Sequence, residues 1–206
     1  KRVVDDIYQC RTISLLPCSY KVISGAICNR LNSVIDKLIN RRQKGFSSTK
    51  ILQNNLLNIF ESINHLNALE IDAALCCVDF RKAFDSISHS FILKIFDFFN
   101  FGNNFIRLIK TIISGKRGRI NVDGTFSPLF DFESGTGQGD NSSPVIFNLA
   151  IEILLCKLVD CNFINIENLS KETLSHNIEL SDAEAYADDA NLLINPTGEN
   201  QALLRV

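Results

Sequence analysis

A pair of adjacent aspartates, Asp188 and Asp189, places the strongest constraint on how this chain can fold. Two neighbouring carboxylates repel each other, and on a regular strand their side chains would point to opposite faces. A short segment, Ala185-Tyr186-Ala187, precedes the pair and an apolar run from Ala190 to Ile194 follows it, which predicts a hairpin. A tight turn lets both carboxylates lean toward one side, where a divalent cation neutralises them. For this segment alone, an exposed turn that solvates its own charge is the alternative interpretation.

A third carboxylate stands at the end of another strand-length run. Residues Ala73 to Val78 are continuously apolar, which predicts a buried strand, and Asp79 and Phe80 follow it. A carboxylate beside a buried strand costs free energy unless it is paired or bound to a metal ion. If this strand lies beside the predicted hairpin, three carboxylates converge on one point. Such a group predicts a site for two hard cations, such as Mg²⁺, held roughly 3.5–4 Å apart for phosphoryl transfer.

Three segments occur in the order and at the approximate spacing of the palm motifs of reverse transcriptases. They are Asp79-Phe80-Arg81-Lys82-Ala83-Phe84-Asp85, Gly135-Thr136-Gly137-Gln138-Gly139-Asp140-Asn141-Ser142-Ser143-Pro144 and Tyr186-Ala187-Asp188-Asp189. Residues 11–16 and 43–46 also resemble the R-P-I-S-L-L and Q-x-G-F segments of LINE-type retrotransposons, which lack long terminal repeats. Together the five segments span nearly the whole chain, which resembles a LINE-type reverse transcriptase.

The resemblance implies an α+β fold, namely the fingers and palm of a right-hand polymerase with an antiparallel palm sheet packed on helices. By this pattern residues 1–72 form a fingers region and 73–101 the first part of the palm. Residues 102–133 form a connecting helix and hairpin, and 134–206 form the second part of the palm. The thumb is expected beyond Val206. The chain starts at Lys1 and contains no Met, so we expect it to be a piece of a longer product.

The activity implied is that of an RNA-directed DNA polymerase, which transfers a nucleotide from a dNTP to a primer 3′-hydroxyl with two Mg²⁺ ions, or Mn²⁺ in their place. Asp79 and Asp188 are the expected principal metal ligands, Asp189 a weaker one, and Phe80 is expected to lend its backbone carbonyl. The implied partners are an RNA template, a DNA primer or target DNA, and dNTPs. In such a reaction the protein contributes mainly by positioning the substrates and compensating their charge.

Four further residues are expected to contact the incoming nucleotide. Phe84 stands where the family keeps an aromatic gate against a ribose 2′-hydroxyl, although it also suits a hydrophobic core. Gln138 and Gly139 are expected against the nucleotide and template, and Arg11 against the triphosphate. A glycine-rich loop at a helix N-terminus is suited to binding phosphate or a sugar backbone.

Several positions depart from the family pattern. Thr12 stands where Pro is usual, Gly137 replaces Arg or Pro, and Asn141-Ser142 replaces a common Pro-Leu. These departures keep open a catalytically inactive, RNA-binding remnant of a retroelement. Among enzymes, a group II intron-type reverse transcriptase is the nearest alternative. A viral RNA-dependent RNA polymerase is a weaker alternative, because that group usually has Gly where this chain has Ala187.

Charge is divided unevenly along the chain. Residues 1–120 hold 18 Lys and Arg against 9 Asp and Glu, whereas residues 121–206 hold 3 against 14. Such polarity predicts a basic surface for nucleic-acid phosphates and an acidic surface for metal ions, with ordinary solvated faces as the alternative. Two short basic segments, 41–46 and 116–119, are candidate contacts for the template or its phosphates.

Seven scattered cysteines without a C-x-x-C pair, and three distant histidines, predict no zinc site and a reduced intracellular compartment. There is no apolar run long enough to span a bilayer, so no membrane partner is expected. The resemblance implies a retroelement ribonucleoprotein of the cytoplasm and nucleus.

Apolar periodicity predicts helices over residues 20–40, 49–67, 88–99, 104–114 and 144–159. Helix ends are predicted from Ser47-Ser48 and Ser143 as N-caps, Pro144 at a first helical position and Gly102 as a stop. Asp123-Gly124 predicts a two-residue hairpin turn.

Overall fold

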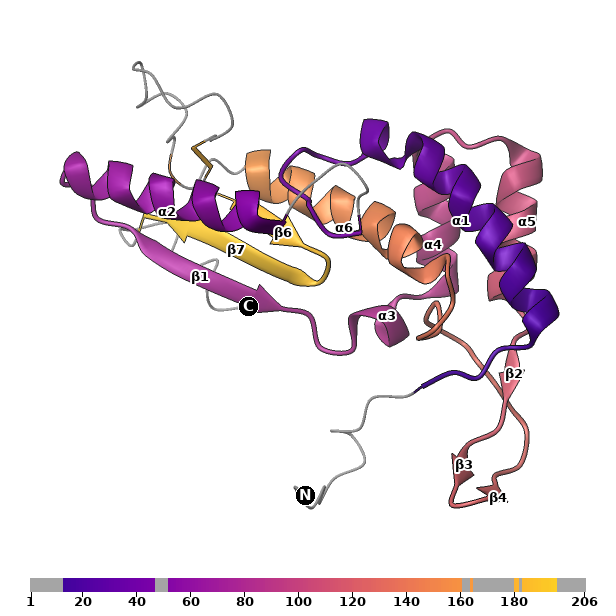
Figure 1. The fold of residues 1–206 in the computed structure, drawn as a ribbon. Coiled ribbons are helices and arrows are strands. Elements are labelled where there is room, and N and C mark those ends of the chain that lie inside the picture. The colour runs from indigo at the N-terminus through magenta and orange to yellow at the C-terminus, as the bar shows by residue number, and fades with distance from the viewer. Residues whose placement is uncertain (1–12, 47–51, 161–163, 165–179, 182, 196–206) are drawn as a thin grey trace. The chain divides into compact units, whose positions relative to one another are not determined.

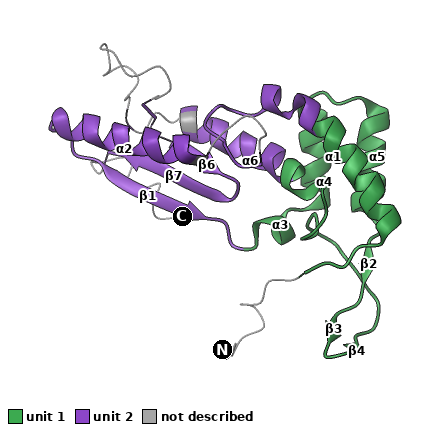
Figure 2. Cartoon of the chain, in the orientation of Figure 1, with its two compact units in different colours: residues 1–31, 82–146 green, residues 32–81, 147–206 purple. Residues whose placement is uncertain are grey.

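The structure is a computed structural model that describes residues 13–46, 52–160, 164, 180, 181 and 183–195. The chain divides into two compact units: residues 1–31 with 82–146 (unit 1), and residues 32–81 with 147–206 (unit 2) (Figure 2). Helices combine with antiparallel strands, which confirms the predicted α+β class. The division into fingers and palm stays a prediction, because units defined by their contacts do not test it.

Unit 2 contains a three-stranded antiparallel sheet. Its strands are β1 (Ala74–Asp79), β6 (Ala183–Tyr186) and β7 (Asp189–Ile194), in the order β1-β7-β6 (Figure 1). The predicted strand before Asp79 and the predicted hairpin are therefore confirmed. The register places Asp79 opposite Asp189 on one side of β7 and Tyr186 opposite Asp189 on the other.

Helices cover both faces of this sheet, because successive residues of β7 alternate between the faces. Leu193 packs against Leu66 of α2 (Leu52–Ala68), which runs alongside β6 and β7 in Figure 1. On the opposite face, Ala190 packs against Leu155 of α6 (Ser143–Asp160). Burying a side chain such as Leu193 contributes roughly 1.5–3 kcal/mol, so the hydrophobic face of each helix holds the strands in register.

The prediction that the strand before Asp79 is buried was wrong. β1 lies at the edge of the sheet, Leu75 is 48% exposed, and Cys77 is also exposed. A continuous apolar run does not distinguish an edge strand from a central one, and the central position belongs to β7. Asp79 is itself exposed, so water solvates its charge and the expected burial penalty does not apply.

Unit 1 is mainly helical. Its elements are the first part of α1 (Cys18–Leu38), α3 (Ala83–Ser86), α4 (His89–Phe98) and α5 (Asn103–Ile113). Phe96 is fully buried and its ring meets Phe101 edge-to-face at 5.0 Å between centroids, while Phe101 stacks on Phe105 at 5.5 Å. These contacts place Phe96 in the hydrophobic core of unit 1.

The helix-end predictions are partly corrected. Gly102 does not stop α4; it has extended backbone and precedes α5, while Asn100 takes the left-handed conformation with φ +55°. Ser143 is the first residue of α6, and its hydroxyl donates to the carbonyls of Thr136 and Gly137, both at 2.9 Å. Ser143 therefore lies inside the helix, one residue later than the N-cap position that was predicted for it. The predicted cap at Ser47-Ser48 lies outside the described residues.

Four two-residue strands complete unit 1. β2 (Arg117–Gly118) pairs with β5 (Phe130–Asp131), and β3 (Asn121–Val122) pairs with β4 (Thr125–Phe126). Asp123 and Gly124 both have positive φ, at 49° and 84°, which the type I′ hairpin turn requires. The predicted turn is confirmed. No helix in the described ranges is both long and apolar enough to cross a membrane.

Candidate active site

Asp79, Asp188 and Asp189 all belong to one end of the sheet in unit 2. Residues directly opposite each other on antiparallel strands project from the same face, so the register brings the side chains of Asp79 and Asp189 together. Both are exposed, whereas Asp188 is half-buried in the turn between β6 and β7. Phe80 directly follows β1 and is half-buried. The structure thus pairs Asp79 with Asp189, with Asp188 next to them in the turn.

The turn depends on an alanine in an unusual conformation. Ala187 and Asp188 form a two-residue connection, and Ala187 has φ +56° while being buried. A positive φ at the first central residue is what the tight hairpin turns of antiparallel strands require. In a residue with a Cβ this conformation costs about 1–2 kcal/mol, so surrounding contacts must hold it.

The donor set suits a divalent cation. Two carboxylates directly opposite each other destabilise a sheet unless their charge is compensated, and hard cations such as Mg²⁺ prefer carboxylate oxygens. In the part of the chain that the structure describes, no group of three His, Cys, Asp or Glu side chains is placed to hold a metal ion. The convergence of all three carboxylates on metal ions stays a prediction.

The basic segment of residues 41–46 does not present a template-binding surface along its length. Arg42, Gln43 and Lys44 are buried, whereas Arg41 and Phe46 are exposed. The Lys44 ammonium lies 3.7 Å from the carboxylate of Glu184 and donates to the Arg41 carbonyl at 2.7 Å. Basic composition predicted exposure, but a buried acid partner on β6 offsets the charge of Lys44.

In unit 1 the predicted gate residue and the glycine-rich loop are joined by their backbones. The Phe84 carbonyl accepts from the Thr136 N–H at 2.9 Å, and the Gly135 N–H donates to the Ile87 carbonyl at 2.7 Å. Gly135 has φ +83°, and a Cβ added there would lie 2.9 Å from the Cα of Asp85. Only glycine therefore allows this close approach.

The other predicted nucleotide-contacting residues have separate positions. Gln138 is half-buried and its carbonyl accepts from the Ser14 N–H at 3.2 Å, while Gly139 is exposed. Arg11 lies outside the described residues. Phe84, Gln138 and Gly139 belong to unit 1, whereas the three carboxylates belong to unit 2.

A buried carboxylate that the sequence analysis missed anchors the glycine-rich loop. Asp140 accepts hydrogen bonds from the hydroxyls of Tyr20 and Ser24 on α1 and from the N–H and hydroxyl of Ser142. The Lys116 ammonium lies 3.5 Å from the same carboxylate and 5.0 Å from the centroid of the Tyr20 ring. The sequence signal was an acidic residue between glycines and serines just before a helix.

The same network shifts three pKa values. Burial alone would raise the pKa of Asp140, but hydrogen bonds from Ser24, Tyr20 and Ser142, together with the charge of Lys116, lower it. Burial and the neighbouring Asp140 carboxylate raise the pKa of Tyr20. Burial also lowers the pKa of Lys116, an effect that Asp140 partly offsets. Lys116 was a candidate phosphate contact, and the structure instead pairs it with Asp140.

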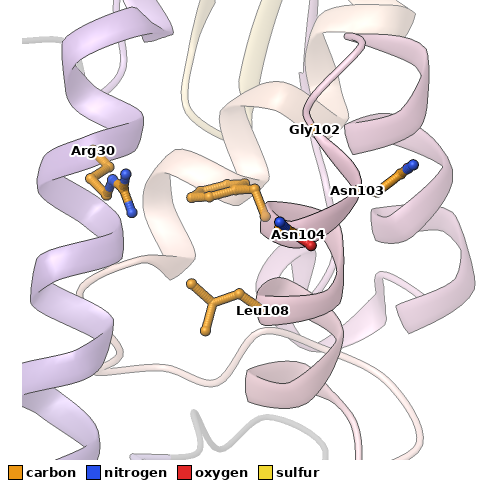
Figure 3. A pocket seen from close by; sticks show the side chains of 6 residues that line it. Arg30, Gly102, Asn103, Asn104 and Leu108 are labelled. Atoms are coloured by element: carbon orange, nitrogen blue, oxygen red, sulfur yellow. The ribbon is translucent and has the colours of Figure 1, made fainter.

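A pocket of about 420 Å³ lies between α1 and α5 in unit 1 (Figure 3). It is lined by Arg30, Gly102, Asn103, Asn104, Phe105 and Leu108. None of the predicted site residues lines it, so the candidate active site does not include it.

Comparison with known families identifies the chain. The family described as reverse transcriptase (RNA-dependent DNA polymerase) matches residues 5–206. The chain therefore belongs to the reverse transcriptase family. This confirms the expectation drawn from its five ordered segments.

Two relatives narrow the class to retrotransposable elements. An uncharacterised 149 kDa protein of transposon TX1 from Xenopus laevis is 27% identical over 183 residues, or 89% of this chain and 14% of the relative. A retrovirus-related Pol polyprotein from the type-2 retrotransposable element R2DM of Drosophila melanogaster is 27% identical over 94% of this chain and 17% of the relative. The chain is a LINE-type reverse transcriptase domain, and it spans less than a fifth of these relatives.

Two solved structures share the fold. Apo telomerase from Candida tropicalis, truncated from its C-terminal domain, matches with a TM-score of 0.55 at 13% identity over 88% of this chain and 35% of that one. Telomerase from Candida albicans with a fragment of telomeric RNA gives 0.57 at 11% identity over 89% and 30%. The fold is therefore a polymerase fold.

Replacing Asp140 by Asn is expected to destabilise unit 1 in a pH-dependent way. Because the pKa of Asp140 is lowered in the folded protein, its ionised form stabilises the fold above the unfolded pKa of about 4, and this contribution is lost as the pH falls through the lowered value. At pH 7 the variant should lose roughly 1–3 kcal/mol, and the difference should shrink below pH ~4. Urea unfolding across pH, followed by circular dichroism, measures this.

Asp131→Asn is the matched control, because Asp131 is exposed and a surface substitution changes stability by less than about 0.5 kcal/mol. An Asp140→Asn variant as stable as this control at pH 7 would contradict the anchoring role.

Gly135→Ala is expected to cost more stability than Gly124→Ala. Both glycines have positive φ, but a Cβ at Gly124 meets open space while one at Gly135 meets the backbone of Asp85. Gly124→Ala should therefore cost about 1–2 kcal/mol, and Gly135→Ala at least ~1 kcal/mol more. Hydrogen exchange of the amides in each turn measures the two effects separately; equal losses would argue against the close approach.

Proposed function

We propose that this chain is the fingers and palm part of the RNA-directed DNA polymerase of a LINE-type retrotransposon. The observation that carries the proposal is the strand register that sets Asp79 opposite Asp189 beside the Asp188 turn, within a chain of the reverse transcriptase family. The reaction is transfer of a nucleotide from a dNTP to a primer 3′-hydroxyl along an RNA template. Relatives from retrotransposable elements favour this reading over a group II intron-type enzyme.

The three carboxylates are proposed to bind metal ions that compensate the charge of the triphosphate. Asp79 and Asp188 are the proposed principal ligands of two Mg²⁺ ions, with Asp189 and the Phe80 carbonyl in supporting roles. When bound, the ions activate the primer hydroxyl and stabilise the leaving pyrophosphate. Asp79 and Asp189 are exposed residues on adjacent strands. A substrate phosphate can therefore reach their carboxylates from solvent.

The nucleotide itself is proposed to contact unit 1. The Phe84 carbonyl accepts from the Thr136 N–H, so the backbone of Phe84 is held against the glycine-rich loop. An aromatic ring at this position is proposed to reject a ribose 2′-hydroxyl by excluding its volume. Gln138 and Gly139 are proposed to contact the incoming nucleotide and the template, and Arg11 the triphosphate.

Nucleic acid is the proposed partner of the basic part of the chain. Residues 1–120 carry 18 Lys and Arg against 9 Asp and Glu, and excess positive charge attracts phosphates without regard to sequence. An RNA template and a DNA primer or target DNA are the proposed ligands, within an intracellular ribonucleoprotein. The alternative function is an inactive RNA-binding remnant, which the departures at Thr12 and Gly137 favour.

Asp79→Asn is expected to slow dNTP incorporation strongly while leaving RNA binding intact. Loss of one metal ligand should lower the rate by roughly 10³-fold, since each ion contributes several kcal/mol of transition-state stabilisation. Removing one of two facing charges should also leave the sheet as stable as before, or more stable by about 0.2–1 kcal/mol. Primer extension on an RNA template with Mg²⁺ and the intact polyprotein measures the rate.

Asp97→Asn, at an exposed position of α4, is the control and should keep the wild-type rate. Tight RNA binding by a wild-type protein that incorporates no dNTP would instead support the inactive remnant.

Phe84→Ala is expected to relax the choice of sugar. Without the aromatic edge, NTP incorporation relative to dNTP should rise roughly 10- to 200-fold, the range that a local change of pocket volume supports. Competition between dNTPs and NTPs in the same assay measures the ratio. Phe91→Ala is the control, because Phe91 is a partly exposed phenylalanine of α4 outside the proposed site. An unchanged ratio in Phe84→Ala would assign Phe84 to packing alone.

A further inference from the structure

The segment of residues 42–45, which we call the latch segment, lies along the outer edge of β6. Gln43 forms a parallel bridge with Ala185. The Ala185 N–H donates to the Arg42 carbonyl and the Lys44 N–H donates to the Ala185 carbonyl, both at 3.0 Å. These bonds add a single parallel β-bridge to the edge of the sheet in unit 2. The latch segment is thereby fixed to the strand that enters the turn before Asp188.

Gln43 uses its whole side-chain amide at that turn. Its Oε1 accepts from the Ala187 N–H at 3.0 Å and from the Gly45 N–H at 2.8 Å. Its Nε2 donates to the Ala187 carbonyl at 3.3 Å. The side chain is 0% exposed, so water does not compete for these bonds. Both backbone polar groups of Ala187 are therefore bound by one amide.

The packing around Ala187 leaves little room for another arrangement. A Cβ added to Gly45 would lie 2.2 Å from the Ala187 nitrogen, so a side chain at position 45 would displace the turn. The Gly45 carbonyl accepts from the side-chain amide of Asn148, a buried residue of α6. Gly45 and Gln43 together hold Ala187 at its positive φ of 56°.

We propose that Gln43 is a positioning residue for the Asp188–Asp189 pair. Rotation about the Ala187 backbone swings Asp188 and shifts Asp189 relative to Asp79. By fixing both polar groups of Ala187, the Gln43 amide sets the direction of the carboxylates without touching them. This inference rests on the proposed polymerase function. It assigns to the latch segment a role inside the protein, in place of the template contact that its composition predicted.

The experiment compares two substitutions that each remove a buried amide next to β6. Gln43→Met keeps the side-chain length and removes both bonds to Ala187 in the turn, together with the bond from the Gly45 N–H. Asn55→Leu is the matched control, because Asn55 is also buried and donates to β6, but at Ala185, at 2.8 Å and away from the turn. Gln43→Glu is the conservative variant, which keeps the acceptor oxygen and loses the donor. All are made in the intact polyprotein.

In single-turnover primer extension, Gln43→Met should lower the maximal rate roughly 10- to 100-fold, since displacing a reacting group by about 1 Å costs on that order. The Mg²⁺ concentration for half-maximal rate should rise several-fold, and the Kd for the template–primer should stay within about twofold. Asn55→Leu should stay within about threefold of the wild-type rate, and Gln43→Glu should fall between the two.

Weaker template binding by Gln43→Met at an unchanged maximal rate would overturn the proposal in favour of template contact. Equal loss of rate in Gln43→Met and Asn55→Leu would overturn it in favour of a purely structural role.

Two further measurements do not depend on polymerase activity. Hydrogen exchange should show the Ala187 amide at least about tenfold less protected in Gln43→Met and unchanged in Asn55→Leu. Binding of Mn²⁺ alone, followed by electron paramagnetic resonance, should weaken several-fold only in Gln43→Met. A wild-type protein that incorporates no nucleotide would contradict the proposed polymerase function. The exchange and Mn²⁺-binding results would still support the positioning role of Gln43 in that case. Unchanged Ala187 protection and unchanged Mn²⁺ binding in Gln43→Met would overturn the proposal.

Discussion

The antiparallel pairing of β7 with a strand on each side is the constraint on which the candidate active site depends. A slip of one residue would move every side chain of a strand to the opposite face of the sheet. Leu193 against α2 and Ala190 against α6 prevent such a slip, because each fits only its own face. The hydrophobic core thereby decides that Asp189, the carboxylate of β7, stands opposite Asp79. Positioning of the acidic residues is thus a consequence of apolar packing several residues away.

Unit 1 is organised by a polar interaction instead. Asp140 gathers donors from α1, from the end of the glycine-rich loop and from Lys116, so segments far apart in sequence meet at one carboxylate. Such a buried group is tolerated because its hydrogen bonds are made within the protein. It holds the loop that contains Gln138 and Gly139 without taking part in the contacts proposed for them. The glycines of this loop allow it to approach neighbouring backbone closely, and the Asp140 carboxylate attaches it to α1 and Lys116.

Sequence patterns predicted the elements well and their surroundings less well. Helical periodicity, the Asp-Gly turn and the Asp188–Asp189 hairpin are local signals, and the structure has all of them. Burial of the strand before Asp79 was predicted wrongly, because the position of a strand in its sheet depends on partners more than 100 residues away. For the same reason the buried contacts of Lys44 and Lys116 were missed: a basic residue looks alike in sequence whether it faces water or an acid. The family resemblance identified the carboxylates, but it gave no sign of how their turn is held.

The position of Asp79 opposite Asp189, at the exposed end of an edge strand, has a consequence for the sheet itself. Two negative charges at the last pair of a strand ladder oppose the hydrogen bonds that close it. The closure of this end of β1 is therefore expected to depend on the ionic composition of the solution. Added salt screens the repulsion, and a divalent cation removes it by bridging the strands. The last pair of β1 and β7 is therefore expected to be held more firmly at higher ionic strength or with a divalent cation bound.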